Sequence, residues 1–204
     1  FEILFLPFFI LVCIAAGKWL LSAMQPSKVA VPRSGAVIPS ITDSLLEKYV
    51  FAFALGAGIL SLAMFFLGVL GLFNPFVIWA LILTFAFLRR GDIIKVFLNS
   101  WKAVKGYYSL PASNFFILLP TVITLSLVAL ASLAPPTYYD TLSYHYALPG
   151  LYVTLGKIAN LPYNFYSHFP QNFEMLYAFA MLAGDYITPN FVTFAAGLFT
   201  LLAA

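Results

Sequence analysis

Long apolar runs constrain this chain more than any other feature of its sequence. Val50–Leu72 carries no charged side chain, and Ile3–Met24 carries only Lys18. At about 1.5 Å of rise per helical residue, either run is long enough to cross roughly 30 Å of hydrocarbon. The chain is 63% hydrophobic and 8% charged, whereas soluble domains are about 25% charged. We therefore predict an integral membrane protein.

Further apolar runs complete a predicted set of four spans. Phe76–Leu88 is short by itself, and we expect it to extend backwards through Asn74 and Pro75. Asn114–Leu133 is long enough alone. Phe173–Ala183 is too short to cross a bilayer, so we expect a re-entrant or interfacial helix there. Another apolar run starts near Phe191.

These runs predict an all-α fold, a polytopic transmembrane helical bundle with a long outer loop carrying juxtamembrane helices. The chain opens at Phe1 rather than Met and stops inside an apolar run, so we expect it to be part of a longer protein and inactive alone. The expected divisions are 1–113, with three transmembrane helices, and 114–204, with a spanning helix at 114–133, an outer loop at 134–190 and a truncated helix from about 191.

The basic residues set the predicted orientation. Eight of the ten Lys and Arg residues lie in two alternate loops, and such loops face the cytoplasm. The loop 134–190 lies on the opposite side, which places Asp140 on the outer face. The eight basic residues are Lys28, Arg33, Lys48, Arg89, Arg90, Lys95, Lys102 and Lys105.

Two local patterns add detail to the first three spans. Residues 92–105 predict a basic amphipathic helix on the cytoplasmic surface, because Ile93, Phe97, Trp101 and Val104 recur at helical spacing opposite lysines. We favour membrane anchoring for it over partner binding. In the second span, two overlapping pairs of small residues recur every four positions, which indicates close helix packing. These pairs are Ala52 with Gly56 and Ala54 with Gly58.

Asp140 is the most informative polar residue of the outer loop. It follows the fourth span directly, in a segment rich in tyrosine, and tyrosine is common at membrane interfaces. A role as helix N-cap is the alternative to a catalytic or ligand-binding role, and the two are compatible. If a helix starts here, Tyr144 shares a face with Asp140, while His145 points elsewhere and forms no local pair with it.

The second half of the loop offers further candidates. Pro170 suits the first turn of the short helix that follows, and Glu174 near its start suits the helix dipole. Gln171 would share a face with Glu174. His168 and Gln171 have a plain alternative role, which is to satisfy backbone groups at a helix start. Lys157 follows a glycine in a predicted turn and is ordinarily a solvated charge.

Other chemistries lack their motifs. The sequence contains no His-Glu-x-x-His, paired-cysteine, Gly-x-x-x-x-Gly-Lys or Gly-x-Ser-x-Gly pattern. We therefore predict no cofactor, and a divalent metal ion stays an alternative that no motif supports. Nothing resembles a nucleic-acid groove, and Cys13, the single cysteine, excludes an intrachain disulfide.

Three segments together carry a resemblance to a known superfamily. They are Pro135–His145, Gly156–Ile158 and Ser167–Tyr177. This arrangement resembles the first outer loop of GT-C fold membrane glycosyltransferases, which include aminoarabinose transferase-like and protein mannosyltransferase-like enzymes. Asp140 falls at the acidic position of that loop. His168 and Pro170 are similar to its His/Lys-Pro-Pro element, although a single proline stands here.

The resemblance implies that residues 114–204 begin a GT-C core of an inverting enzyme in a prokaryotic plasma membrane. Its donor would be a polyprenyl-phosphate-linked sugar, and its acceptor a lipid, glycan or protein on the outer face. Asp140 would be the catalytic base. The substrate-binding candidates are Tyr139, Tyr144, His145, Lys157, His168, Gln171 and Glu174.

Two alternatives stay open. The first is a non-enzymatic multi-pass protein, either a transporter subunit or an assembly scaffold, in which the tyrosines form a plain interfacial belt. The second is a membrane metal enzyme that uses Asp140, His145, His168 and Glu174. The first predicts that Asp140→Asn is tolerated, and the second predicts stoichiometric bound metal.

Overall fold

The computed structural model describes residues 2–24, 45–106 and 115–204. Lys28, Arg33 and Asn114 lie outside these ranges, and the side chains of residues 100–115 are not described. Within the described ranges the protein is helical and has no β-strand. The α-helices are α1 (Glu2–Met24), α2 (Leu45–Val69), α3 (Pro75–Leu88), α4 (Arg90–Gly106), α5 (Phe115–Ala131), α6 (Ala147–Leu155), α7 (Asn172–Ala183) and α8 (Pro189–Ala203).

Two helices are long and apolar enough to cross a membrane. They are Leu4–Met24 of α1 and Leu46–Val69 of α2. The apolar helices α3 and α5 are shorter, with 14 and 17 residues, so they reach about 21 and 26 Å. The predicted backward extension of α3 is confirmed for Pro75, where the helix begins, and wrong for Asn74, which is the N-cap and accepts a hydrogen bond from the Phe76 amide at 2.8 Å.

α1 and α2 meet through small residues, as the spacing in the second span predicts. A Cβ on Gly17 would lie 1.8 Å from the Ala52 carbonyl oxygen, and one on Gly56 would lie 1.7 Å from that of Cys13. Only residues without a side chain allow backbones to approach this closely. The second small-residue pair does not take part, because Gly58 faces open space.

α7 lies at the centre of the fold. It packs against α2, α3, α6 and α8, and Phe179 contacts the rings of Phe5 and Phe9 on α1. Every residue from Glu174 to Ala183 is buried. The apolar side chains of this helix are therefore covered by protein on all sides, as expected of a helix that is hydrophobic all round.

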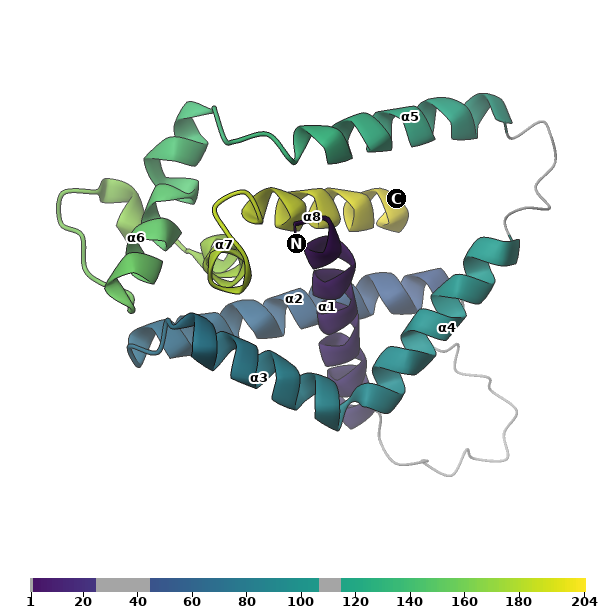
Figure 1. Ribbon diagram of the computed structural model, residues 1–204, viewed down its shortest axis with the longest axis horizontal. Coiled ribbons are helices and arrows are strands. Elements are labelled where there is room, and N and C mark those ends of the chain that lie inside the picture. The colour runs from purple at the N-terminus through teal and green to yellow at the C-terminus, as the bar shows by residue number, and fades with distance from the viewer. Residues whose placement is uncertain (1, 25–44, 107–114) are drawn as a thin grey trace, which may run out of the picture.

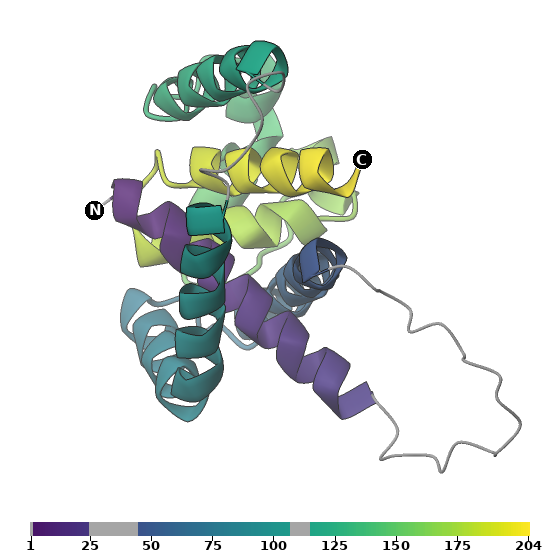
Figure 2. The same ribbon diagram turned by 90° about the vertical axis from the view of Figure 1, so that its right-hand side faces the viewer.

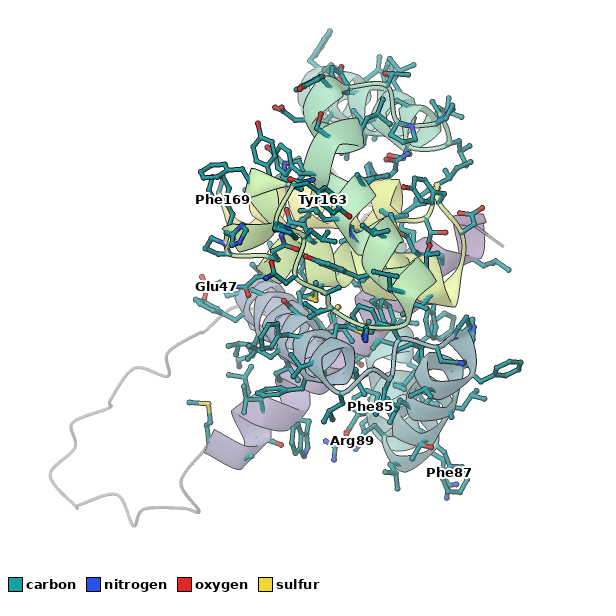
Figure 3. All side chains as sticks on the ribbon, turned by 90° about the vertical axis from the view of Figure 1, so that its left-hand side faces the viewer. Glu47, Phe85, Phe87, Arg89, Tyr163 and Phe169 are labelled. Atoms are coloured by element: carbon teal, nitrogen blue, oxygen red, sulfur yellow. The ribbon has the colours of Figure 1, made fainter. Side chains whose placement is uncertain are left out.

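The two ends of α3 lie in different parts of the molecule (Figure 1). The turn from α2 to α3 lies near α6, while the corner from α3 to α4 lies at the bottom of the view, away from α6. Seen at right angles, α1 crosses α2 rather than running alongside it (Figure 2). Figure 3 likewise separates Tyr163 and Phe169, on the loop after α6, from Phe87 and Arg89 at the α3–α4 corner.

α4 covers the predicted amphipathic segment, whose apolar face is predicted to meet the membrane surface rather than the protein core. Val96 is buried, and α4 packs against α1. Phe97, assigned to the apolar face, is 56% exposed together with Ile94 at 55%. The helix begins with an ion pair between Arg89 and Asp92 at 2.7 Å. Val96, a buried residue of α4, thus lies between the predicted apolar and polar faces of the helix.

Candidate functional site

The segment 134–190, predicted as an outer loop, is largely helical and wraps the start of α7. It contains the π-helix η3 (Thr141–His145), α6 and the 3-10 helix η4 (Phe165–His168), ahead of α7 itself. In Figure 1 these elements lie together at one end of the molecule. They bring side chains of distant sequence position to one place.

Asp140 stands at the start of η3 with its side chain exposed. The carboxylate makes no capping hydrogen bond, so the N-cap alternative is not realised. The turn closes through the Tyr146 amide, which donates to the Thr141 carbonyl at 2.8 Å, an i→i+5 bond. Such π-helical turns are rare in proteins, and many of those that do occur are found at functional sites.

His145 and Glu174 form the most distinctive contact of this region. The His145 Nδ1 lies 2.7 Å from Glu174 Oε1. The Glu174 side chain is 9% exposed and that of His145 is 39% exposed. The expectation that His145 does not pair with Asp140 on its own helix agrees with the structure, since its carboxylate partner comes from α7.

Two tyrosine rings extend from His145. The Tyr144 ring lies 4.0 Å from the His145 ring and 4.3 Å from the Tyr166 ring, centroid to centroid. Partial burial raises the pKa of the Tyr144 hydroxyl, and the neighbouring Asp140, Tyr166 and Glu174 raise it further. The phenol therefore keeps its proton and remains able to donate a hydrogen bond.

The inner side of the pair faces another phenol. Burial raises the pKa of Tyr152 on α6, and the charge of Glu174 adds to this effect. A carboxylate as deeply placed as Glu174 needs a hydrogen-bond or charge partner, and His145 provides it. Glu174 also stands in the first turn of α7, where the helix dipole favours a negative charge, as the sequence predicts.

A groove of about 650 Å³ opens between α5 and α8. Aliphatic and aromatic side chains of the two helices form most of its wall, and one end carries Thr141, Tyr146, Tyr177, Asn190 and Thr193. Here the Tyr177 and Thr193 hydroxyls lie 2.8 Å apart. Tyr138 and Thr141, on either side of Asp140 in sequence, both line the groove.

Asn190 holds the polar end of this groove together. Its Nδ2 donates to the carbonyls of Ser132 at 3.1 Å and Ala134 at 2.9 Å, and its Oδ1 accepts from the Tyr146 hydroxyl. The residue thereby joins the end of α5 to the start of α8. No short-range signal in the sequence indicates this role, because its partners are more than 40 residues away.

Tyr139, Lys157 and Gln171 take no part in the contact between His145 and Glu174. Tyr139 is 77% exposed, and Lys157 follows the far end of α6. Gln171 is the N-cap of α7, so Pro170 precedes the helix rather than opening it. The side-chain amide of Gln171 donates a hydrogen bond to the Tyr166 carbonyl at 3.1 Å.

The described residues also show what His168 contacts and whether a metal ion could bind beside it. His168 Nδ1 lies 3.3 Å from Ser167 Oγ, within its own turn. Among the described residues, no three His, Cys, Asp or Glu side chains gather closely enough to hold a metal ion. The geometry thus offers no support for a metal centre built from His168 with Asp140, His145 and Glu174.

Comparisons with known proteins add no relative. No family model, curated protein or solved structure matches this chain. The resemblance to GT-C glycosyltransferases therefore rests on the three sequence segments, and the functional argument rests on the geometry of the site.

Proposed function

We propose that this chain is part of a multi-pass membrane glycosyltransferase that transfers a sugar from a polyprenyl-phosphate donor to a lipid, glycan or protein acceptor. The observation that carries the proposal is the groove between α5 and α8. Its wall is mostly apolar, and its polar end is lined by Tyr138, two positions before Asp140, and by Thr141, the residue after it. A ligand with a long apolar chain and a polar head group matches these properties.

The surface supports a location in the membrane. Two helices have the length and composition of membrane spans. Large apolar side chains also point outward from shorter helices, among them Leu83 at 62%, Phe87 at 67% and Phe116 at 84% exposure. A patch of this kind on several helices is costly in water and favourable in lipid.

The charge distribution supports an outer-face site in a prokaryotic plasma membrane. Lys48 stands near the start of α2, and Arg89 and Arg90 stand at the corner after α3. Both places lie away from α6 and the site (Figure 1). Basic residues favour the cytoplasmic side, so Asp140 would face outward.

Asp140 is the proposed general base. In an inverting displacement the acceptor hydroxyl oxygen attacks the sugar C1, the bond from C1 to the phosphate oxygen breaks, and the polyprenyl phosphate departs with the electron pair. The acceptor proton goes to the base. Asp140 suits this role because its carboxylate is exposed and free of a capping bond.

The test compares the full-length wild-type protein with Asp140→Asn in membranes at matched expression. Consumption of radiolabelled polyprenyl-phosphate sugars is measured across a panel of donors. We expect turnover by the wild type and a loss of about a hundredfold to ten-thousandfold in the variant, the range for a general base. Asp92→Asn is the matched control, since that carboxylate pairs with Arg89 at 2.7 Å, away from the site.

Each result has a definite meaning. Turnover lost in Asp140→Asn and kept in Asp92→Asn would support both the enzyme and the base. Equal turnover by all three proteins would remove Asp140 from the mechanism. No turnover by the wild type on any donor would refute the glycosyltransferase and favour a transporter subunit or scaffold.

A further inference from the structure

We propose that a cavity between α2, α6 and the start of α7 binds one neutral sugar unit of the acceptor. The inference rests on the proposed function, because that function requires a second substrate besides the lipid donor. The cavity has a volume of about 260 Å³ and shares no lining residue with the groove between α5 and α8. The lipid donor and the acceptor sugar thus occupy separate sites.

The lining of this cavity combines aromatic rings with uncharged polar side chains. A mostly apolar pocket with a few polar groups that converge on it is typical of sites for small ligands. A sugar ring has the matching chemistry, because its hydroxyls form hydrogen bonds while its C–H groups pack against aromatic carbon. The rings are those of Phe65, Tyr152 and Phe169, and the polar side chains are those of Ser167, Gln171 and Asn172.

The absence of charge in the lining selects a neutral ligand. Among the described residues that line this cavity, none is Asp, Glu, Lys, Arg or His. A charged ligand enclosed here would lose its water without gaining a charged partner, which costs far more than enclosing a hydroxyl. One water molecule needs only about 10–15 Å³, so the cavity is also much larger than a hydration site. It therefore suits an uncharged, hydroxyl-bearing ring better than a phosphate.

Gln171 supplies an acceptor that the protein itself leaves unused. Its Nε2 donates to the Tyr166 carbonyl at 3.1 Å, and because a carbonyl can only accept, the amide nitrogen must face Tyr166. The Oε1 of the same amide is buried and accepts no hydrogen bond from the described residues. A buried acceptor without a donor is costly to a folded protein. A ligand hydroxyl that donates to this oxygen removes that cost.

Hydrogen bonds between distant segments hold the walls of the cavity in place. The Ile158 amide, in the loop after α6, donates to the Gly68 carbonyl of α2 at 2.9 Å. The Ser61 hydroxyl, also on α2, donates to the Asn172 carbonyl at the start of α7. The segments that line the cavity are thus fixed to α2 before any ligand enters. Binding to walls that are already ordered loses less conformational entropy.

The position of the cavity agrees with an acceptor site on the outer face. Phe65 stands one turn before the end of α2, which is the outer end in the proposed orientation. The carbonyl of Tyr166 accepts from Gln171, and the Tyr166 ring stacks on that of Tyr144 with 4.3 Å between centroids. Tyr144 follows Asp140 by four positions. The cavity wall is thus in contact with the segment that carries the proposed base.

The experiment measures binding of methyl glycosides to the purified full-length protein in a detergent without sugar head groups, by saturation-transfer difference NMR. The panel contains the methyl glycosides of glucose, galactose, mannose and N-acetylglucosamine. Cyclohexylmethanol, which keeps a six-membered ring but has a single hydroxyl, and methyl glucuronide, which adds a carboxylate, are the control ligands. We expect at least one glycoside to bind and both control ligands to bind more weakly.

Gln171→Met tests the unused acceptor, because methionine has a similar length and no amide oxygen. The variant should weaken glycoside binding by about two- to tenfold, the range for one neutral hydrogen bond. It should melt like the wild type, because the Tyr166 carbonyl also accepts from the Phe169 amide at 3.1 Å and so stays paired.

A matched pair of variants tests the aromatic wall. Phe169 lines the cavity and is 47% exposed, whereas Tyr163, on the same loop, is 78% exposed and is not among the lining residues; Figure 3 labels both. Phe169→Leu removes a ring face and should weaken glycoside binding by about two- to tenfold. Tyr163→Leu is the control and should bind like the wild type. If Phe169→Leu melts at a lower temperature, the affinity of Gln171→Met decides.

The readings separate this inference from the proposed function. No binding of any glycoside, or equal binding of either control ligand, would overturn the sugar site and leave Asp140-dependent turnover as it stands. Unchanged affinity in both Gln171→Met and Phe169→Leu would overturn it as well. Glycoside binding with the expected losses, but no turnover of any lipid donor, would support the sugar site and count against the proposed function.

Discussion

The contact between α1 and α2 gives the sharpest prediction, because one small-residue pair of α2 is in contact and the other is not. A Cβ on Gly56 would lie 1.7 Å from the Cys13 carbonyl oxygen, while a Cβ on Gly58 meets nothing within 4 Å. Both glycines lie inside the same helix, Leu45–Val69. Gly56→Ala and Gly58→Ala therefore differ in packing and share the same change in helix propensity.

The magnitude follows from this distance. A carbon normally stays about 3.4 Å from a carbonyl oxygen, so the two backbones must separate by about 1.7 Å to accept the methyl group of Gly56→Ala. Overpacking of this kind costs about 1–3 kcal/mol. Gly58→Ala should gain up to about 1 kcal/mol from helix propensity, a gain that Gly56→Ala shares. We expect the two variants to differ by about 3 kcal/mol, the upper end of that range, because the obstacle is backbone rather than a flexible side chain.

Thermal unfolding of the full-length protein in detergent, followed by circular dichroism, measures this difference. For a chain of this size 1 kcal/mol corresponds to about 2–4 °C, so Gly56→Ala should melt roughly 6–12 °C below Gly58→Ala. Equal melting temperatures, or a lower one for Gly58→Ala, would show that α1 does not pack on this face of α2.

Two more predictions concern buried contacts. Asn190→Ala removes the donors to the Ser132 and Ala134 carbonyls and the acceptor for the Tyr146 hydroxyl. The loss of these hydrogen bonds should lower the free energy of unfolding by about 2–4 kcal/mol. A melting temperature unchanged within error would contradict this prediction. Cys13 is 0% exposed, so a maleimide should modify its thiol only as fast as the protein unfolds. Mass spectrometry measures this modification. Immediate modification of the native protein would mean that α1 is not packed against its neighbours.

The site illustrates how a short-range pattern and a long-range contact contribute different information. The sequence singles out Asp140, His145 and Glu174 as candidates because a polar segment follows a long apolar run. It could not indicate that His145 and Glu174 are partners, because 29 residues separate them and no helical period relates them. That pairing depends on the way η3 and α6 fold back onto the start of α7.

The apolar runs by themselves determined the helical class of the protein and its excess of hydrophobic surface. The 3.6-residue period and the length of a run are local properties, so the presence of α1, α2 and the helix at α7 follows from them. The exact ends of the helices could not be predicted as well from these runs. Asn74 looked like part of a span, but its side chain is a cap, since its oxygen satisfies the Phe76 amide that the helix leaves free.

Only the tertiary structure decided which faces are buried and which polar groups meet. The two small-residue pairs of α2 are equivalent in sequence, yet Gly56 packs against α1 and Gly58 does not, because the crossing of the two helices selects one face. Phe173–Ala183 is too short to span a membrane by the length rule, and the structure buries it among other helices instead. Burial and pairing are sums over contacts between distant segments, and no local pattern contains them.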